Sequence, residues 1–264
     1  MPELPEVETF VRGLAPAVGR TIVSADVLDA RLAVSAENLV GARIAGIRRR
    51  GKYIEINLGD DRSLVIHLRM SGRLRIECRE CEAKYARVIL RLDDGQCVYF
   101  VDPRRLGTAE LVEGELELPL GVEPLEPAFT TAVLSKLTSE SRAPIKQLLL
   151  DQRKVAGIGN IYAAEALWRA KLDPRRKANE LSRAEIARLH KAIVGVLGEA
   201  IAQLGTTLGS SVSDYHPTAT KTGSFQNRLA VYGREGEPCE RCGEGIERVI
   251  QAGRSTCFCP ACQR

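Results

Sequence analysis

The first six residues of the chain include groups that can do covalent chemistry on a sugar. Loss of Met1 would make Pro2 the N-terminus, and its nitrogen would then be a free secondary amine. An α-amino group titrates at about 7.7–8.0, so part of it is uncharged and nucleophilic at neutral pH. Attack on a sugar C1′ gives an iminium ion, which acidifies the C2′ proton and favours elimination. With the carboxyl groups of Glu3 and Glu6 beside it, Pro2 is a candidate nucleophile.

The same residues also fit the start of a helix. Proline suits the first turn, and acidic side chains complement the positive end of the helix dipole. Apolar residues follow at helical spacing, so we predict a helix over residues 3–18. On these residues alone both interpretations stay open, and the chemical one requires removal of Met1.

Two Cys-x-x-Cys pairs close the chain, Cys239 with Cys242 and Cys259 with Cys262, and residues 243–258 separate them. This spacing is typical of a tetrahedral four-thiolate zinc site, which leaves no open position for catalysis. We therefore predict one structural Zn²⁺ ion. Arg254 falls near the tip of a predicted β-hairpin between the pairs, where its guanidinium is suited to bidentate contact with a phosphate.

The other cysteines form no comparable set. Cys78 and Cys81 form a Cys-x-x-Cys pair with no second pair to complete a four-cysteine set. This pair is interpreted as incidental, as part of a second metal site or as a redox pair. Cys257 does not fit the zinc spacing. Five of the eight cysteines lie between residues 239 and 262, and this uneven crowding favours a metal site in a reducing compartment over a disulfide framework.

Composition sets broad limits on the function. The 264 residues suffice for two domains, and we find neither a signal-peptide pattern nor an apolar run of membrane-spanning length, which predicts a cytoplasmic protein. The net charge of +4 permits nucleic acid as a partner. Basic clusters such as 48–52, 104–105 and 175–177 favour a basic groove, although each alone is also typical of a solvated surface.

The pattern along the chain predicts an α+β protein. Seven short runs between Thr21 and Val101 alternate like strands and are separated by turns, which favours an antiparallel β-sandwich in a domain of residues 1–115. Residues 116–129 are acidic and rich in proline, and we interpret them as a linker. Residues 130–230 have helical periodicity and precede a zinc finger over 231–264.

Within the helical part, Ser182 and Glu185 predict a capping box for a helix whose apolar stripe runs from Ile186 to Leu204. Residues 205–223 are rich in glycine, serine and threonine, so we expect a flexible loop there or a lid over the substrate.

Three further sites have two interpretations each. The glycines of residues 157–162 lead into a helix, so Asn160 at its cap could help bind a phosphate, or the segment is only a tight turn. Lys52 follows Gly51 directly before a predicted strand. It is either an active-site cation or part of a solvated basic edge. His67 lies in an alternating strand and is predicted to be structural rather than functional.

Together, these motifs resemble the formamidopyrimidine-DNA glycosylases, bacterial base-excision repair enzymes of the helix-two-turn-helix superfamily. The matching motifs occur in the same order from the first residues to the last: residues 2–8, 51–53, 102–105, 157–162 and the two cysteine pairs. The resemblance implies a β-sandwich with an N-terminal helix, a helix-two-turn-helix domain with a flexible lesion loop, and a zinc finger.

The activity that the resemblance implies is that of a bifunctional DNA glycosylase and abasic-site lyase. Such an enzyme flips an oxidised purine, 8-oxoguanine or a formamidopyrimidine, out of damaged double-stranded DNA. Pro2 would form the Schiff base at C1′, Glu3 would donate and accept protons, and Lys52 would act as general acid or phosphate clamp. β- and δ-elimination would follow with no organic cofactor and no catalytic metal, in a monomer associated with the bacterial nucleoid.

The resemblance also implies DNA contacts. It assigns them to Lys154, Asn160 and Arg254. The family fills the space of the flipped base with a wedge of methionine, arginine and phenylalanine, and here Met70 and Arg104 match while Leu106 replaces the phenylalanine. Leucine can push between base steps but cannot stack, so recognition of the estranged base is expected to differ.

Two alternatives remain at this stage. The endonuclease VIII branch shares the proline chemistry but prefers oxidised pyrimidines, and Leu4 favours the purine branch because the pyrimidine branch more often has glycine there. The chain could also be a non-catalytic zinc-ribbon DNA-binding homologue, against which the intact Pro2, Glu3 and Lys52 argue.

Overall fold

The computed structural model describes residues 1–78, 84–207 and 223–264. The chain divides into two compact units: residues 1–118 with 203–224 form unit 1, and residues 119–202 with 225–264 form unit 2. The domain boundaries expected from the sequence stay predictions. Cys81 and most of the expected loop at 205–223 lie outside the described residues.

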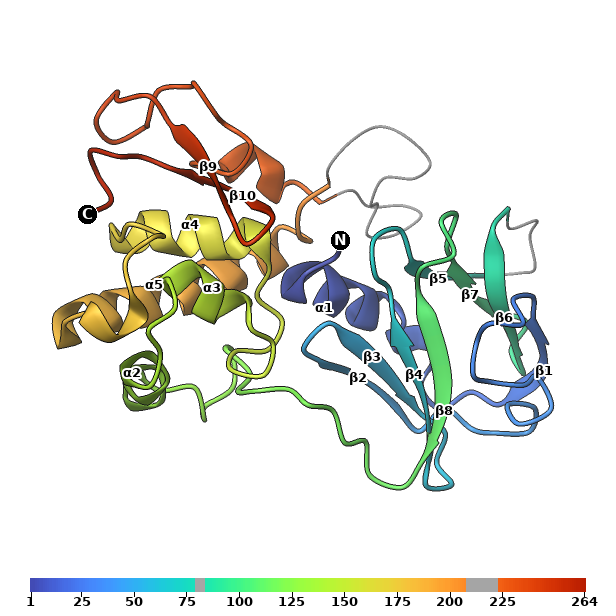
Figure 1. Ribbon diagram of the computed structural model, residues 1–264. Coiled ribbons are helices and arrows are strands. Elements are labelled where there is room, and N and C mark those ends of the chain that lie inside the picture. Colours follow the sequence, from blue (N-terminus) through green and yellow to red (C-terminus); the bar gives the residue numbers. More distant parts are fainter. Residues whose placement is uncertain (79–83, 208–222) are drawn as a thin grey trace. The chain divides into compact units, whose positions relative to one another are not determined.

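Unit 1 contains the predicted antiparallel sandwich (Figure 1). One sheet has the order β1-β6-β7-β5 and the other the order β2-β3-β4-β8. The strands are β1 (Ile22–Val27), β2 (Gly46–Arg50), β3 (Tyr53–Asn57), β4 (Arg62–His67), β5 (Arg73–Glu77), β6 (Ala86–Leu92), β7 (Cys97–Val101) and β8 (Thr108–Glu113). All seven predicted strands are present, and β8 is an additional strand that the sequence analysis did not identify.

Apolar side chains from both sheets and from the N-terminal helix form one core. In β6 every second residue is buried, whereas β7 is buried along its whole length. The alternating sequence pattern of β6 therefore corresponds to a strand with one buried and one partly exposed face, as a period of two residues predicts. Val7 and Phe10 join this core from the helix and hold the N-terminus against the sandwich.

The N-terminal helix is shorter than predicted. Helix α1 spans Leu4–Gly13, and a 3₁₀ turn follows at Ala15–Ala17. Pro16 explains the difference, because proline has no N–H to donate and its ring clashes with the preceding turn of an α-helix. Glu3 is the N-cap residue and forms a reciprocal capping box with Glu6.

Two connections of the sandwich run from one sheet to the other and meet at the same corner. Residues 68–72 join β4 to β5, and residues 102–107 join β7 to β8. At one end His67 of β4 pairs with Thr108 of β8, and at the other Arg73 of β5 pairs with Val101 of β7. This register places the two connections side by side.

Unit 2 is helical and ends in a β-hairpin (Figure 1). Its helices and strands are α2 (Thr131–Ser139), α3 (Ile145–Leu150), α4 (Asn160–Ala170), α5 (Arg183–Ala202), β9 (Glu247–Gln251) and β10 (Arg254–Phe258). Five of the apolar residues of the predicted stripe in α5 are buried, from Ile186 to Ile201. Leu204 is not part of the stripe, because the helix ends at Ala202 and Leu204 has a positive φ of 60°. Among the described residues, no helix has the length and hydropathy that crossing a bilayer requires.

The predicted capping box of α5 is present and yields a test of stability. The Ser182 N–H donates to Glu185 Oε2 at 2.8 Å, and Arg176 forms an ion pair with the same carboxylate. The Arg176 guanidinium is the main cause that lowers the pKa of Glu185 to about 2. We expect Glu185→Gln to lower the free energy of unfolding at pH 7 by about 0.5–1 kcal/mol, the scale of a partly exposed ion pair, because glutamine keeps the capping acceptor but loses the charge that pairs with Arg176.

A carboxyl group whose pKa is lower in the folded state than in the unfolded state stabilises the fold at any pH above its unfolded-state pKa. This stabilisation is lost as the pH falls toward the folded-state pKa. The difference between wild type and variant should therefore shrink between about pH 5 and pH 3, measured by circular dichroism melts. Glu126→Gln, an exposed residue of the same unit, serves as control. A difference that stays constant down to pH 3 would contradict this account.

Candidate active site and zinc centre

Charged residues gather around the N-terminus of unit 1. Pro2 is buried, and the exposed fractions of Glu3, Glu6 and Lys52 are only 3%, 1% and 6%. Burial lowers the pKa of the Met1 amine, Glu3 and Glu6 act in the opposite direction, and Lys52 lowers it further. The predicted nucleophile and its candidate acid–base partners therefore lie together.

The local fold fixes each of these groups. The Glu3 N–H donates to Glu6 Oε2 at 2.8 Å, which locks the entry into α1. Lys52 lies in the two-residue turn between β2 and β3, where Arg50 pairs with Tyr53 and Gly51 adopts a positive φ of 58°. Because Lys52 is buried, it is not part of a solvated basic edge, the alternative that the sequence left open.

Glu6 also holds a segment that is distant in sequence. Its Oε1 accepts the N–H of Thr206 at 2.8 Å and the Thr206 hydroxyl at 3.0 Å. A Cβ on Gly205, whose φ is +76°, would come within 2.7 Å of the same oxygen, so only glycine fits there. The sequence analysis named Glu6 only as a neighbour of Pro2. Gly205 was the one feature of the sequence that could have indicated its contact with Thr206.

The three residues of the expected wedge are carried by the two connections at the sandwich corner. Met70 lies in the connection 68–72, and Arg104 and Leu106 lie in the connection 102–107. All three are exposed, and Met70 and Leu106 are 46% and 45% accessible despite their apolar side chains. We use the name wedge for these three residues.

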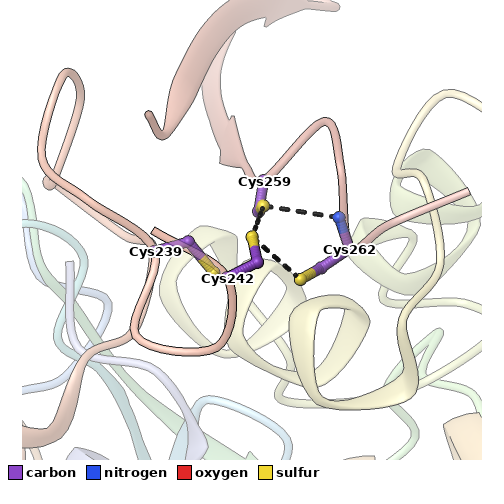
Figure 2. Close-up of side chains that lie close together, drawn as sticks. All are labelled: Cys239, Cys242, Cys259 and Cys262. Carbon is purple, nitrogen blue, oxygen red and sulfur yellow. Dashed lines mark hydrogen bonds between the residues drawn. The ribbon is translucent and has the colours of Figure 1, made fainter. Parts of the chain in front are cut away.

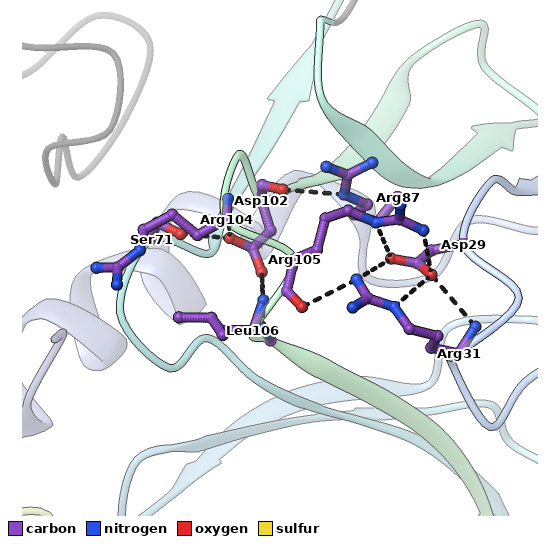
Figure 3. A network of polar contacts seen from close by, with 9 residues as sticks. Asp29, Arg31, Ser71, Arg87, Asp102, Arg104, Arg105 and Leu106 are labelled. Carbon is purple, nitrogen blue, oxygen red and sulfur yellow. Dashed lines mark hydrogen bonds and ion pairs between the residues drawn. The ribbon is translucent and has the colours of Figure 1, made fainter.

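A buried aspartate holds Arg105, which lies within the same connection as two of the wedge residues. Asp29 accepts hydrogen bonds from the guanidinium groups of Arg105, at 2.8 and 2.9 Å, and of Arg31, at 2.9 and 3.0 Å (Figure 3). Arg31, followed by Arg105, keeps the pKa of Asp29 far below its ordinary range. Arg31 also donates to the Arg105 carbonyl at 2.9 Å, so both ends of Arg105 are fixed. The sequence analysis did not identify Asp29 or Arg31.

His67 is structural, as predicted from its strand. Its Nδ1 accepts the N–H of Arg69 at 3.0 Å, and its ring meets Tyr53 edge to face with the centroids 4.6 Å apart. Burial, with help from Arg69 and Lys52, lowers the pKa of His67 to about 4, so the ring is neutral at pH 7. It thereby supports the backbone just before Met70.

Unit 2 carries the predicted zinc centre, formed by Cys239, Cys242, Cys259 and Cys262 (Figure 2). All four sulfur atoms lie within 4.8 Å of one another, and Cys242 Sγ is 3.5 Å from Cys259 Sγ and 3.3 Å from Cys262 Sγ. Zn–S bonds of about 2.3 Å place the sulfurs of a tetrahedral site about 3.8 Å apart, so these residues fit zinc.

The donor chemistry supports the same assignment. Burial, then hydrogen bonds with the neighbouring cysteines, and last repulsion from Cys259 raise the pKa of Cys262 to about 12. A divalent cation removes that repulsion, and four protein ligands complete its coordination. Cys257 is buried beside this cluster but is not one of the four ligands, and Cys78 is exposed in unit 1.

The zinc hairpin presents Arg254. Ala252 and Gly253, with positive φ of 47° and 74°, form the two-residue turn between β9 and β10. Arg254 is the first residue of β10, pairs with Gln251 and is exposed. The turn and the strand pairing therefore place Arg254 in an exposed position at the end of the hairpin.

Asn160 differs from the expected position by one residue. Gly159 is the N-cap of α4, and Asn160 is the first residue of the helix. Its Nδ2 donates to the Ser255 carbonyl at 2.9 Å, and its buried Oδ1 has no hydrogen-bond partner within the described ranges. Lys154 lies between α3 and α4, where its carbonyl accepts the Val122 N–H at 3.2 Å.

Two buried charged residues that the sequence analysis missed fix the segments around the hairpin. Lys146 Nζ donates to the Ser255 carbonyl at 3.0 Å and to the Thr256 hydroxyl at 2.7 Å. Glu165 accepts the backbone N–H groups of residues 230, 231 and 232 at 2.9 to 3.0 Å. Lys146 is the one charged residue of α3, and Glu165 shares α4 only with Arg169, so neither residue belongs to a motif that a sequence search could detect.

Comparison with known families covers almost the whole chain. Residues 1–109 match the formamidopyrimidine-DNA glycosylase N-terminal domain. Residues 120–212 match the H2TH domain of the same enzymes, and residues 236–264 match the zinc finger found in FPG and IleRS.

Individual relatives agree along their full length. The chain is 44% identical to the formamidopyrimidine-DNA glycosylase of Chloroflexus aurantiacus over 275 residues, covering 100% of this chain and 98% of that protein. The enzyme of Paracoccus denitrificans is also 44% identical, over 286 residues and 100% of both chains.

Solved structures extend the agreement to the fold. The MutM (Fpg) protein of Thermus thermophilus has a TM-score of 0.90 and 44% identity, covering 99% of this chain and 98% of that one. Lactococcus lactis Fpg with abasic-site DNA has a TM-score of 0.88 and 37% identity, covering 99% of both. With its fold, its zinc centre and its N-terminal residues all in agreement, the chain belongs to the formamidopyrimidine-DNA glycosylase family.

Proposed function

We propose that this protein is a bifunctional DNA glycosylase and abasic-site lyase that removes oxidised purines, 8-oxoguanine and formamidopyrimidines, from double-stranded DNA. The observation that carries the proposal is the buried charged cluster at the N-terminus, in a chain that belongs to this family. Lactococcus lactis Fpg has been solved with Fapy-dG-containing DNA and with abasic-site DNA. Leu4 and the full-length match to Fpg enzymes favour oxidised purines over oxidised pyrimidines.

Pro2 is the proposed nucleophile once Met1 has been removed. Its amine attacks C1′ of the flipped nucleotide, and the base leaves with the electrons of the glycosidic bond. The O4′–C1′ bond then opens as the nitrogen lone pair forms the iminium ion. The lowered pKa that burial gives the Met1 amine supports the proposal, because it reflects surroundings that disfavour a charged amine at this end of the chain, and a nucleophilic amine needs its lone pair free.

Glu3 and Lys52 are the proposed acid–base residues. Glu3 gives a proton to O4′ as the ring opens and receives a proton when C2′ is deprotonated, after which the 3′ phosphate leaves by β-elimination. Loss of the 5′ phosphate by δ-elimination leaves a one-nucleoside gap. Lys52, fixed in its buried turn, is a general acid or a clamp for the phosphate beside the lesion.

DNA binding is assigned to residues in both units. The wedge of unit 1 occupies the space of the flipped base, and Lys154, Asn160 and Arg254 of unit 2 bind phosphates. When bound, zinc supplies a strong crosslink that fixes the hairpin of Arg254. We place the protein on the nucleoid in the bacterial cytoplasm, acting as a monomer.

The first test is borohydride trapping on a duplex that contains 8-oxoguanine opposite cytosine. We expect an adduct that mass spectrometry locates on Pro2. Pro2→Gly should cut strand cleavage by at least about 100-fold, the scale expected when a covalent nucleophile is altered. Pro127→Gly, at an exposed proline of unit 2, serves as control. Normal strand cleavage by Pro2→Gly would rule out the assigned nucleophile, and faster incision of a thymine glycol duplex would reassign the substrate to pyrimidines.

A second test addresses Arg254. Arg254→Ala should weaken binding to abasic-site DNA and make the plot of log affinity against log salt shallower by about 1, because one phosphate contact is lost. Arg183→Ala, an exposed arginine at the start of α5, is the matched control. A slope identical to that of wild type would contradict the phosphate contact.

The zinc centre gives a third test. Cys259→Ser should abolish bound zinc and tight DNA binding while unit 1 keeps its β-sheet signal by infrared spectroscopy, because a two-stranded hairpin is only marginally stable by itself. Cys78→Ser, an exposed cysteine outside the zinc centre, should behave like wild type. Unchanged DNA affinity in Cys259→Ser would show that the metal does not support DNA binding.

A further inference from the structure

One buried carboxylate contacts both connections that carry the wedge. Asp102 is 1% exposed. Its Oδ1 accepts the hydroxyl of Ser71 at 2.5 Å, and its Oδ2 accepts the N–H groups of Leu106 and Gly107, each at 2.7 Å. Oδ1 also lies 3.3 Å from the N–H of Arg104 (Figure 3). Asp102 thus binds the neighbour of Met70 and the backbone of both other wedge residues.

The backbone of Asp102 is itself fixed to the neighbouring strand. Its N–H donates to the Tyr85 carbonyl at 3.0 Å, and its carbonyl accepts from Arg87 Nε at 2.9 Å (Figure 3). Arg87 belongs to β6, a strand whose alternate residues lie in the core. The carboxylate therefore acts from a rigid support.

Two glycines let the connections close around Asp102. A Cβ on Gly107 would come within 2.6 Å of the Phe100 ring and 3.2 Å of Asp102 Oδ2. A Cβ on Gly72 would come within 2.5 Å of the Leu68 carbonyl, which accepts the Gly72 N–H at 2.9 Å. These contacts leave no space for a side chain at either position.

Pre-organisation matters for a wedge more than for most surface loops. Connections of this length are ordinarily mobile, and ordering them on binding would reduce the free energy available for unstacking a base pair, which costs a few kcal/mol. Exposed apolar side chains on a backbone that a buried polar network holds in place are suited to use at an interface. The Ser71 hydroxyl and three backbone N–H groups also satisfy the Asp102 carboxylate, whose burial without hydrogen-bond donors would destabilise the fold.

We propose that Asp102 is the positioning residue of the wedge: it holds the connections 68–72 and 102–107 together, so that Met70, Arg104 and Leu106 are presented as one unit before DNA is bound. The inference rests on the proposed function, because a wedge acts only in an enzyme that extrudes a base. Asp102 itself does not touch the reacting atoms in this role.

Asp102→Asn is the direct test, because it replaces one acceptor oxygen with an amino group that faces N–H donors. On a duplex with 8-oxoguanine opposite cytosine, we expect kcat/KM to fall roughly 10- to 100-fold, the scale of several lost buried hydrogen bonds. Cleavage of a preformed abasic site in the same duplex should change less than about 3-fold, because no base has to be extruded. Asp93→Asn, in an exposed turn, is the matched control.

A double-mutant cycle shows whether Asp102 acts through the wedge. If it does, Asp102→Asn combined with Leu106→Ala should be scarcely worse on the 8-oxoguanine duplex than the more impaired single variant, whereas independent effects would multiply. A 2-aminopurine beside the lesion should also gain less fluorescence on binding to Asp102→Asn than to wild type. Ser71→Ala removes one contact of the network and should give a smaller loss with the same substrate preference, which keeps the test possible if Asp102→Asn does not fold.

The outcomes separate the two claims. Equal losses on both duplexes, or multiplicative effects in the cycle, would overturn the positioning role and leave the proposed function in place. Wild-type activity of Asp102→Asn and Ser71→Ala on both duplexes would also overturn it. Failure of the wild-type protein to cleave either duplex would overturn the proposed function and the wedge inference with it.

Discussion

The functional parts of this protein depend on buried carboxylates that are satisfied by backbone N–H groups. A buried carboxylate is costly unless donors surround it, so it fixes whichever segments supply those donors. Glu6 holds the segment at Thr206, Asp102 holds the connection 102–107, and Glu165 holds residues 230–232. Each carboxylate comes from a helix or a strand end in the core, and each held segment is a loop. The rigid core thereby determines where the loops lie.

The topology of the sandwich decides which loops can be held together. Here β4 pairs with β8 and β5 pairs with β7, so the connection from β4 to β5 must lie beside the connection from β7 to β8. Two stretches that are distant in sequence, with 31 positions from Ser71 to Asp102, thus become one surface. A wedge built from two segments needs such a corner, because neither connection alone presents all three side chains.

Local patterns in the sequence were sufficient for most elements and for the metal site. Strand alternation, the Ser182–Glu185 box and the cysteine spacing all act within a few residues, and the structure confirms the strands, the cap and the sulfur cluster. What the sequence could not reveal are contacts such as Glu6 with Thr206, 200 residues apart, and Asp29 with Arg105, 76 apart. Their side chains carry no period or spacing, because only the three-dimensional fold brings them together. β8 was missed for a related reason: its pairing with β4 defines it more than its own charged sequence does.

The zinc centre and the N-terminal cluster meet different physical requirements: one places an exposed charge, and the other buries reactive groups. The proposed chemistry needs a nucleophile and acid–base groups that are shielded from water, and in unit 1 the candidates are buried at the start of α1 and in the turn between β2 and β3. Phosphate binding instead needs an exposed guanidinium, and an exposed two-stranded hairpin has little core of its own to hold one. In unit 2 the metal ligands fix one end of the hairpin, and the buried Lys146 binds the strand right after Arg254, through the Ser255 carbonyl. In the proposed mechanism zinc therefore serves to place Arg254, while the reaction uses the side chains of unit 1 and the terminal amine.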